Sequence, residues 1–267
     1  MRTLAFKFLT LEGVPVFVYH GMSEGAEYHG PARDKKYCVT RAQFHEHLSH
    51  TRSAGFSTTL LTDMWAPSVP NNVSTSKVVL TFDDGLASDY RVAFPTLQEV
   101  GARAEFFLNT SAIGKEGYLS WQQIKEMQKW GMSFQSHGHD HVDFTRLSKS
   151  AMDRQLRVSK SQLEDRLARS VDFFAAPYGR NNEGIVRSTQ EAGYRAVCTC
   201  RSWPARSGRC VDRTVLFRHT TSREFQRLLK CNALGYLGRL ARKPLYLPGW
   251  LLMQISPGSV GIRILEE

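Results

Sequence analysis

The feature of this sequence that most restricts its fold is a series of short apolar runs that alternate with helical patterns. Several runs are continuously apolar, which is typical of parallel strands covered by helices. The runs lie at residues 15–20, 57–61, 77–82, 104–109, 132–136, 171–175, 194–199 and 214–219. Alternation of strand and helix predicts an α/β fold with a parallel sheet, either open or closed into a barrel.

The segments between these runs carry the start signals and the periodicity of helices. Thr40 and Ser120 each begin a capping-box pattern, with a glutamine three residues later. Between Met152 and Leu167, apolar residues recur with a helical period. In α/β folds of this kind the chemistry lies at the carboxyl ends of the strands. The residues that end the apolar runs are therefore the candidates for function.

Length and charge limit the domain organisation and the class of partner. A chain of 267 residues fits one main domain, and an α/β barrel commonly needs about this length. The 35 Lys and Arg outnumber the 25 Asp and Glu, which favours anionic surroundings such as acidic polysaccharide or phosphorylated lipid head groups. The basic residues are scattered and no nucleic-acid-binding motif is recognised, so a nucleic-acid partner is disfavoured.

The N-terminus and the cysteines favour a cytoplasmic location, with membrane association as a further option. Lys7 and Glu12 interrupt the first apolar stretch, which lacks the pattern of a signal peptide. The five cysteines form no disulfide framework, as expected in a reducing compartment. Cys198 and Cys200 are interpreted as residues of a buried strand, although half of a metal site is the alternative reading.

Two adjacent acids end the run at 77–82. Asp83 and Asp84 stand side by side before Gly85, although their charges repel each other. A plain turn is the simplest interpretation, because Asp and Gly both favour turn geometry. A function for the pair requires something nearby that offsets the repulsion.

A histidine-rich segment, "HGHDH" at 137–141, follows the run at 132–136. His137 and His141 are four residues apart, a separation that lets two imidazoles converge on one ion. His139 and Asp140 are alternative ligands in the same segment, and a histidine-rich surface loop is the alternative without a metal.

A divalent ion held by Asp84, His137 and His141 would resolve the repulsion between the two acids, because Asp83 could remain ionised next to it. Three protein ligands leave a position open for water, which is the pattern of a catalytic site. Asp83 would then accept the proton of that water as it attacks a carbonyl.

A third candidate segment is "FFAAPYGRNNE" at 173–183. Pro177 restricts the backbone and Gly179 permits a tight turn, so Tyr178 would be held over the strand end. A backbone N–H in such a turn can point at a developing oxyanion. An ordinary strand-to-helix turn is the alternative.

The motifs "TFDDG", "SHGHDH" and "PYG", in this order, resemble the signature of the polysaccharide deacetylases, carbohydrate esterase family 4. The opening "VPVFVYHGM" also resembles the branch of that family that serves exopolysaccharide synthesis. The resemblance covers roughly residues 14–230, and the first two motifs are the most specific.

This resemblance implies a single-domain, distorted (β/α) barrel of about seven parallel strands that removes N-acetyl groups from an amino-sugar or glycan substrate. It also implies one divalent metal ion, with zinc expected first and cobalt, nickel or iron as alternatives. Asp83 matches the catalytic base, and Asp84, His137 and His141 match the metal triad. Tyr178 matches the residue whose backbone N–H stabilises the oxyanion.

The chain departs from the family pattern in three places. Ala175 stands where the third motif often has an arginine that orients the base. Trp203 matches the tryptophan of the fourth motif, but without its acid. His219, expected at the end of the last strand, matches the histidine of the fifth motif and is the candidate general acid, although Phe217 replaces the family's leucine. An alternative alignment stresses Arg218 instead, and a surface histidine that opens the next helix is the alternative without a catalytic role. The alternative function is a catalytically impaired carbohydrate-binding protein on the same fold.

We therefore expect an N-terminal extension at 1–13, a barrel at 14–230 and a C-terminal segment at 231–267. The last segment mixes basic residues with an apolar cluster around Trp250. Such a segment packs on the outside of the barrel or lies on an anionic membrane surface. Nothing in the sequence indicates an oligomeric state.

Overall fold

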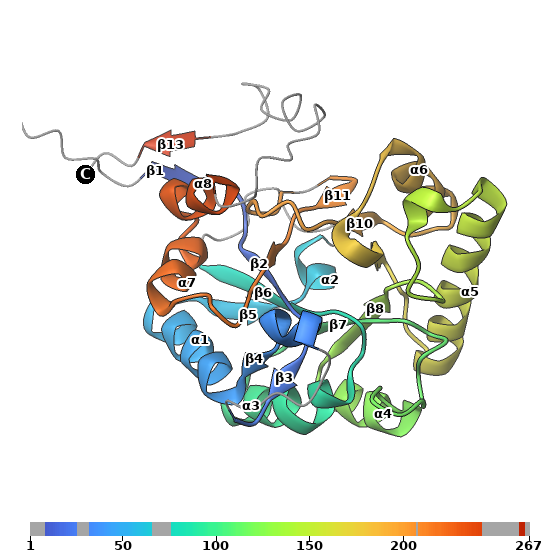
Figure 1. Ribbon diagram of the computed structural model, residues 1–267, viewed down its shortest axis with the longest axis horizontal. Coiled ribbons are helices and arrows are strands. Elements are labelled where there is room, and N and C mark those ends of the chain that lie inside the picture. The colour runs from blue at the N-terminus through green and yellow to red at the C-terminus, as the bar shows by residue number, and fades with distance from the viewer. Residues whose placement is uncertain (1–8, 26–31, 66–75, 207, 242–261, 265–267) are drawn as a thin grey trace, which may run out of the picture.

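The computed structural model describes residues 9–25, 32–65, 76–206, 208–241 and 262–264, and its centre is one curled sheet surrounded by helices (Figure 1). The strands of that sheet are β2 (Val16–Tyr19), β5 (Ser57–Thr59), β6 (Lys77–Phe82), β7 (Glu105–Leu108), β8 (Ser133–Ser136), β9 (Phe173–Ala175), β10 (Ala196–Cys198), β11 (Cys210–Val211) and β12 (Thr214–Val215). Their order is β11-β10-β9-β8-β7-β6-β2-β12, and β5 pairs with β6. Every pairing within this sheet is parallel.

The prediction of an α/β fold with a parallel, barrel-like sheet is confirmed. The sheet has nine strands in the described part of the chain, against about seven expected, because short strands are added at its edges. The two edge strands, β11 and β12, are separated by residues 212–213 alone. The chain therefore runs directly from one edge of the sheet to the other, which brings the two edges together.

Helices surround the sheet between its strands. They are α1 (Arg41–Ser53), α2 (Leu61–Met64), α3 (Phe94–Glu99), α4 (Trp121–Lys129), α5 (Lys149–Leu167), α6 (Glu183–Glu191), α7 (Ser222–Leu229) and α8 (Ala233–Ala241). A π-helical turn at Asp89–Ala93 precedes α3. The capping boxes predicted at Thr40 and Ser120 are both present, at the starts of α1 and α4.

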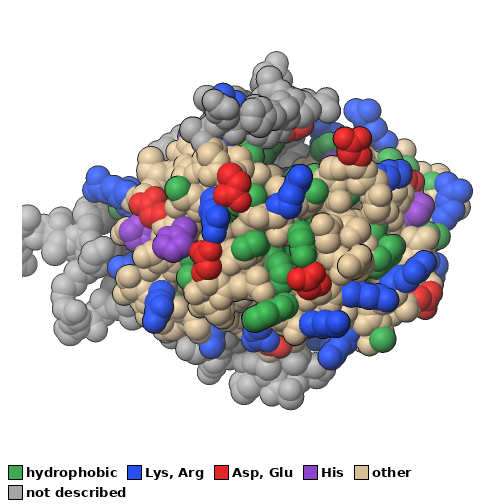
Figure 2. Space-filling view, turned by 90° about the horizontal axis from the view of Figure 1, so that it is seen from below, with side chains coloured by type: hydrophobic (Ala, Val, Ile, Leu, Met, Phe, Trp, Pro, Cys, Tyr) green, Lys and Arg blue, Asp and Glu red, His purple; other side chains and the backbone are tan. Residues whose placement is uncertain are grey.

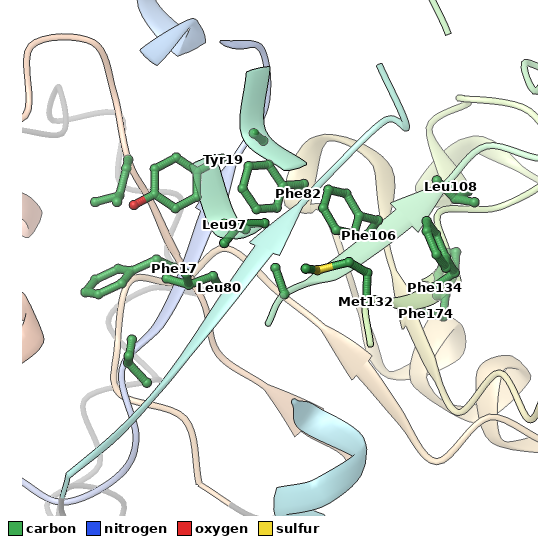
Figure 3. Close-up of a cluster of buried hydrophobic side chains, with 14 of the residues drawn as sticks. Phe17, Tyr19, Leu80, Phe82, Leu97, Phe106, Leu108, Met132, Phe134 and Phe174 are labelled. Atoms are coloured by element: carbon green, nitrogen blue, oxygen red, sulfur yellow. The ribbon is translucent and has the colours of Figure 1, made fainter. Parts of the chain in front are cut away.

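The apolar core has two layers because successive strand residues face opposite sides of the sheet. Between sheet and helices, aromatic rings stack in a row: the centroids of Tyr19 and Phe82 lie 5.2 Å apart, and those of Phe82 and Phe106 lie 4.8 Å apart (Figure 3). Burial of each such ring contributes about 1.5–3 kcal/mol. The inner layer, on the concave side, contains Val79, Phe107, Phe173, Ala175 and Cys198.

Two predicted strands end earlier than expected. The run at 214–219 forms β12 only as far as Val215. Beyond it the chain turns, because Thr220 bonds back to Phe217 through its backbone N–H and accepts the Phe217 N–H with its hydroxyl. The prediction that His219 ends this strand is therefore wrong. The run at 57–61 likewise leaves the sheet after Thr59, and Leu61 begins α2.

Residues from the two ends of the chain lie side by side (Figure 1). β1 (Leu9–Leu11) pairs antiparallel with β13 (Ile262–Ile264). Helix α8 packs beside β1 and α7, and its Tyr236 is buried and stacks on Trp203. Residues 242–261, which include the apolar cluster around Trp250, lie outside the described residues.

On the face seen in Figure 2, acidic side chains lie among the Lys and Arg side chains of the described residues. This arrangement agrees with the scattered charge expected from the sequence. Among the helices of the described residues, none has the length and apolar character needed to cross a bilayer.

Candidate metal centre and catalytic residues

The alternation of inward and outward residues along β6 places Asp83 inside the curled sheet. Val79 belongs to the inner core layer, and Thr81 is the next residue on that face. Asp83 continues the series at the carboxyl end of the strand and is 2% exposed. Its backbone N–H still donates to the carbonyl oxygen of Tyr19, so the base candidate remains attached to the sheet.

Asp84 leaves the strand geometry through a left-handed turn. Its φ is 78°, a conformation that Asp adopts more readily than most residues. Gly85 has a φ of 68°, which favours glycine, and a Cβ there would lie 2.7 Å from a terminal methyl group of Leu108, which would have to move. In a regular strand, neighbouring side chains would point to opposite faces. The turn instead lets Asp83 and Asp84 approach the same pair of histidines.

Asp84, His137 and His141 come together, with candidate ligand atoms all within 4.8 Å of one another. Oδ1 of Asp84 lies 3.4 Å from Nε2 of His137 and 3.3 Å from Nε2 of His141. That oxygen is buried and has no hydrogen-bond partner among the described residues. A buried acceptor of this kind needs a partner, and it faces the two imidazoles.

The tautomer of His137 follows from its contact with β9. Its Nδ1 lies 2.7 Å from the carbonyl oxygen of Ala175. A carbonyl oxygen only accepts, so Nδ1 carries a proton, and in the neutral imidazole the lone pair lies on Nε2, which faces Asp84. This is the usual orientation of a metal-binding histidine.

The alternative ligands in the same loop have other partners. Nδ1 of His139 lies 2.8 Å from the hydroxyl of Thr110. A carboxylate oxygen of Asp140 accepts from the side-chain amide of Gln155. Neither residue joins the cluster of three, so the structure brings together His137 and His141 with Asp84.

The pKa values within the cluster reflect both burial and charge. Burial alone would raise the pKa of Asp84, but His137, His20 and His141 hold it well below its ordinary value. Burial would lower the pKa of His137, but Asp84 and Asp83 raise it. Burial and the neighbouring His137 lower the pKa of His141. The cluster therefore keeps its carboxylate ionised at neutral pH.

Asp83 is held by Arg213, a residue that the sequence analysis did not identify. Nη1 of Arg213 donates to Oδ1 of Asp83 and Nη2 donates to Oδ2, both at 2.8 Å. Burial would raise the pKa of Asp83, but Arg213 and His137 hold it below its ordinary value. The candidate base is therefore an anion deep inside the barrel.

Tyr178 lies over the cluster from the turn after β9. Its ring meets that of His141 edge to face, with centroids 4.7 Å apart. Tyr178 itself has a φ of 62°. The next residue, Gly179, has a φ of 66°, and a Cβ there would lie 2.8 Å from Cys200. The backbone conformation of this turn therefore depends on glycine, as the sequence indicates.

The structure places His20, rather than a residue after β12, beside the two acids. His20 follows Tyr19 at the end of β2, which pairs with β6, and its imidazole is one of the groups that lower the pKa values of Asp83 and Asp84. Its Nδ1 is buried without a hydrogen-bond partner in the described part of the chain. His219 is exposed and stacks on Phe217, with ring centroids 5.3 Å apart. Its role as a proton donor stays a prediction.

The central part of the chain matches a known protein family. The model of the polysaccharide deacetylase family matches residues 71–197. This part of the chain is a polysaccharide deacetylase domain. The matched residues include the triad of Asp84, His137 and His141, together with Asp83 and Tyr178. Two residues of the site described above, His20 and Arg213, lie outside the matched range, as does His219.

The polysaccharide deacetylase domain has relatives in both sequence and structure. YxkH of Bacillus subtilis, proposed by its name to be a polysaccharide deacetylase, is 26% identical over 187 residues, covering 70% of this chain and 64% of YxkH. PgdA of Listeria monocytogenes, named a peptidoglycan-N-acetylglucosamine deacetylase, is 24% identical, covering 56% of this chain and 32% of PgdA. The chain thus spans less than two thirds of the length of these two curated relatives.

The solved fold of the Streptococcus pyogenes deacetylase PplD, in complex with acetate, superposes with a TM-score of 0.73. The match covers 82% of this chain and 99% of that one at 22% sequence identity. At this identity the likeness concerns the fold, and it agrees with the distorted (β/α) barrel expected from the sequence.

The polysaccharide deacetylase family is metal-dependent, and the triad fits a divalent ion. It offers one carboxylate oxygen and two imidazole nitrogens, a donor set that suits zinc and related transition metals. The buried, unpartnered Oδ1 of Asp84 and the fixed tautomer of His137 are the features expected of ligands.

Proposed function

We propose that this domain is a metal-dependent hydrolase that removes N-acetyl groups from an amino-sugar substrate. The observation that carries the proposal is the buried, ionised Asp83 directly beside the triad of Asp84, His137 and His141. A buried ion pair is often no more stabilising than a well-packed apolar pair, so stability alone gives little reason for an anion in that place. A carboxylate there can accept a proton, which amide hydrolysis requires.

The relatives support the substrate class. PgdA is named for deacetylation of peptidoglycan N-acetylglucosamine, and YxkH for a polysaccharide. We propose an N-acetylated sugar unit within a poly- or oligosaccharide, or a glycan biosynthesis intermediate, as the substrate. Zinc is the expected ion, with cobalt, nickel or iron as alternatives.

Each residue has a distinct part in the proposed reaction. A divalent ion bound by the triad would polarise the acetyl carbonyl and lower the pKa of a water molecule. Asp83 accepts the proton of the attacking water. The backbone N–H of Tyr178 donates to the oxygen that becomes negatively charged as the carbonyl carbon turns tetrahedral.

The final step needs a proton donor for the departing amine, because an amide nitrogen leaves poorly as an anion. Histidine suits this role, since it titrates near neutral pH. His20, beside Asp83 and Asp84, and His219, from the family resemblance, are the two candidates. The position of His20 favours it.

The test is release of acetate from a panel of substrates by the zinc-loaded protein. The panel contains N-acetylglucosamine oligomers, peptidoglycan fragments, and lipid- or nucleotide-linked N-acetylated amino sugars. We expect acetate from at least one of them, loss of release after chelation, and recovery on adding metal back. A protein that binds zinc in the triad and releases no acetate from any of them would contradict the proposal.

A further inference from the structure

Arg213 comes from an irregular part of the chain, yet its side chain reaches the centre of the barrel. It is fully buried, and residues 212–213 form the link between the edge strands β11 and β12. The carbonyl oxygen of Arg213 accepts the backbone N–H of Ser202 at 3.0 Å, which holds its backbone at this junction. The meeting of the two sheet edges therefore decides where the guanidinium lies.

We propose that Arg213 is the positioning residue for the catalytic base Asp83, in place of the arginine that is missing at Ala175. This inference rests on the proposed function and deepens it. The arginine of the family's third motif and Arg213 would approach the base from different strands, because Ala175 lies on β9 whereas Arg213 follows β11. The same task would thus be carried out from another side of the barrel.

The contacts of the guanidinium restrict the orientation of the Asp83 carboxylate. Two parallel hydrogen bonds of 2.8 Å join Arg213 to the two carboxylate oxygens. A bidentate pair of this kind fixes the plane of the carboxylate as well as its distance. Nη1 also donates to the hydroxyl of Thr81 at 3.1 Å, and Nε donates to the carbonyl of Thr199 at 3.3 Å.

The packing around Arg213 agrees with an arginine at position 213 taking the place of one at position 175. The guanidinium lies 4.8 Å from the ring centroid of Phe107. Phe107 and Ala175 belong to the same inner core layer, and Ala175 is paired with Cys198 on the neighbouring strand. A small side chain at 175 leaves the interior of the barrel open to an arginine from the link between β11 and β12.

A purely structural role would not favour this pair. Two charges buried inside a barrel lose their hydration, and a well-packed apolar pair is often equally stable. A lysine would keep the charge but could not make the two parallel bonds. The geometry therefore points to orientation of the base as the reason for an arginine here.

The experiment compares Arg213→Ala with the double variant Ala175→Arg/Arg213→Ala, after the wild-type rate has been measured. We expect Arg213→Ala to lower kcat about 100-fold with KM and metal content retained, because orientation matters in the chemical step. The double variant, which returns an arginine from β9, and added guanidinium ion should each restore at least part of kcat. Arg209→Ala is the matched control, since Arg209 lies in the same segment but pairs with Glu183 at the surface.

Arg213→Lys keeps the measurement interpretable if Arg213→Ala fails to fold. We expect this variant to fold, to retain the metal and to have a lower kcat, because lysine keeps the positive charge but cannot make the two parallel hydrogen bonds to Asp83. An unchanged kcat in Arg213→Lys or Arg213→Ala would overturn the proposal. A kcat loss that neither guanidinium nor the second-site arginine restores would also overturn it.

A second readout does not depend on turnover and separates this inference from the proposed function. Melting temperatures are measured for Asp83→Asn, Arg213→Ala and the combination of both. If the two residues are coupled, the decrease in melting temperature of the double variant should be smaller than the sum of the decreases of the two single variants. Additive shifts would overturn the pairing whether or not the protein is a deacetylase, whereas a wild type without turnover would count against the proposed function alone.

Discussion

The Nδ1 atom of His137 lies 2.7 Å from the carbonyl oxygen of Ala175, so strand β9 sets the tautomer of a candidate metal ligand that follows β8. This backbone contact holds a proton on Nδ1, so Nε2 is the atom that offers its lone pair when a metal ion binds beside Asp84. Because the contact is made by the backbone carbonyl of Ala175, it does not depend on which side chain position 175 carries.

The first prediction concerns the ion. His137→Ala should abolish both the binding of one zinc ion per chain and the activity. The change removes an imidazole ligand together with the hydrogen bond to Ala175 that orients this ligand. His139→Ala is the control, since His139 bonds to Thr110 instead. Metal content after dialysis and acetate release are the measurements. A His137→Ala protein that kept its zinc would place the metal elsewhere.

The two neighbouring acids should respond differently to the loss of their charge. Asp83→Asn should keep the metal and lose most turnover, at least about 100-fold, because only the proton acceptor is removed. Asp84→Asn should weaken zinc affinity about 10-fold or more, because it replaces a charged ligand by a neutral one. Zinc titration with a competing chelator and kcat separate the two effects. If Asp83→Asn emptied the site, the two roles would have to be exchanged.

The identity of the proton donor is the third prediction. His20→Gln should lower kcat about 100-fold with metal retained, because His20 lies beside the two acids. His219→Gln, at an exposed residue stacked on Phe217, should lower kcat only a few-fold. A larger loss in His219→Gln than in His20→Gln would assign the role to His219.

The fourth prediction concerns stability and the buried acid Glu105 on β7. Burial raises the pKa of Glu105 to about 8, from an ordinary value of 4.5. Between pH 4.5 and about 8, Glu105 keeps its proton in the folded state but has lost it in the unfolded state. The contribution of Glu105 to the free energy of unfolding therefore decreases as the pH rises through this range. The shift from 4.5 to about 8 corresponds to roughly 5 kcal/mol at most, because one pKa unit is worth about 1.4 kcal/mol, and nearly all of this stability is lost by about pH 8.

Glu105→Gln should remove this dependence. We expect the variant and the wild type to have similar free energies of unfolding near pH 5, with the variant more stable by about 1–4 kcal/mol at pH 8. Urea unfolding at a series of pH values measures the difference. Parallel stability curves for the two proteins would show that Glu105 does not titrate in this range.

The sequence predicted the parts of this protein that depend on local pattern. Continuous apolar runs indicated a parallel sheet, and the glutamines three residues after Thr40 and Ser120 indicated the helix starts that the structure has. The spacing of Asp84, His137 and His141 at strand ends predicted that they would meet, because parallel strands end at the same edge. The same rule could have found His20, which ends the first apolar run.

Contacts between distant segments were decided only by the tertiary structure. Arg213 reaches Asp83 across 130 positions of sequence, from a two-residue link that has no periodicity to indicate where its side chain points. The early end of β12 likewise depends on the turn closed by Thr220, which moves His219 away from the strand end. Local pattern determined which residues lie on the inner face of each strand, because that depends on a period of two. The partners across the barrel depend on how the sheet closes, which is a property of all its strands together.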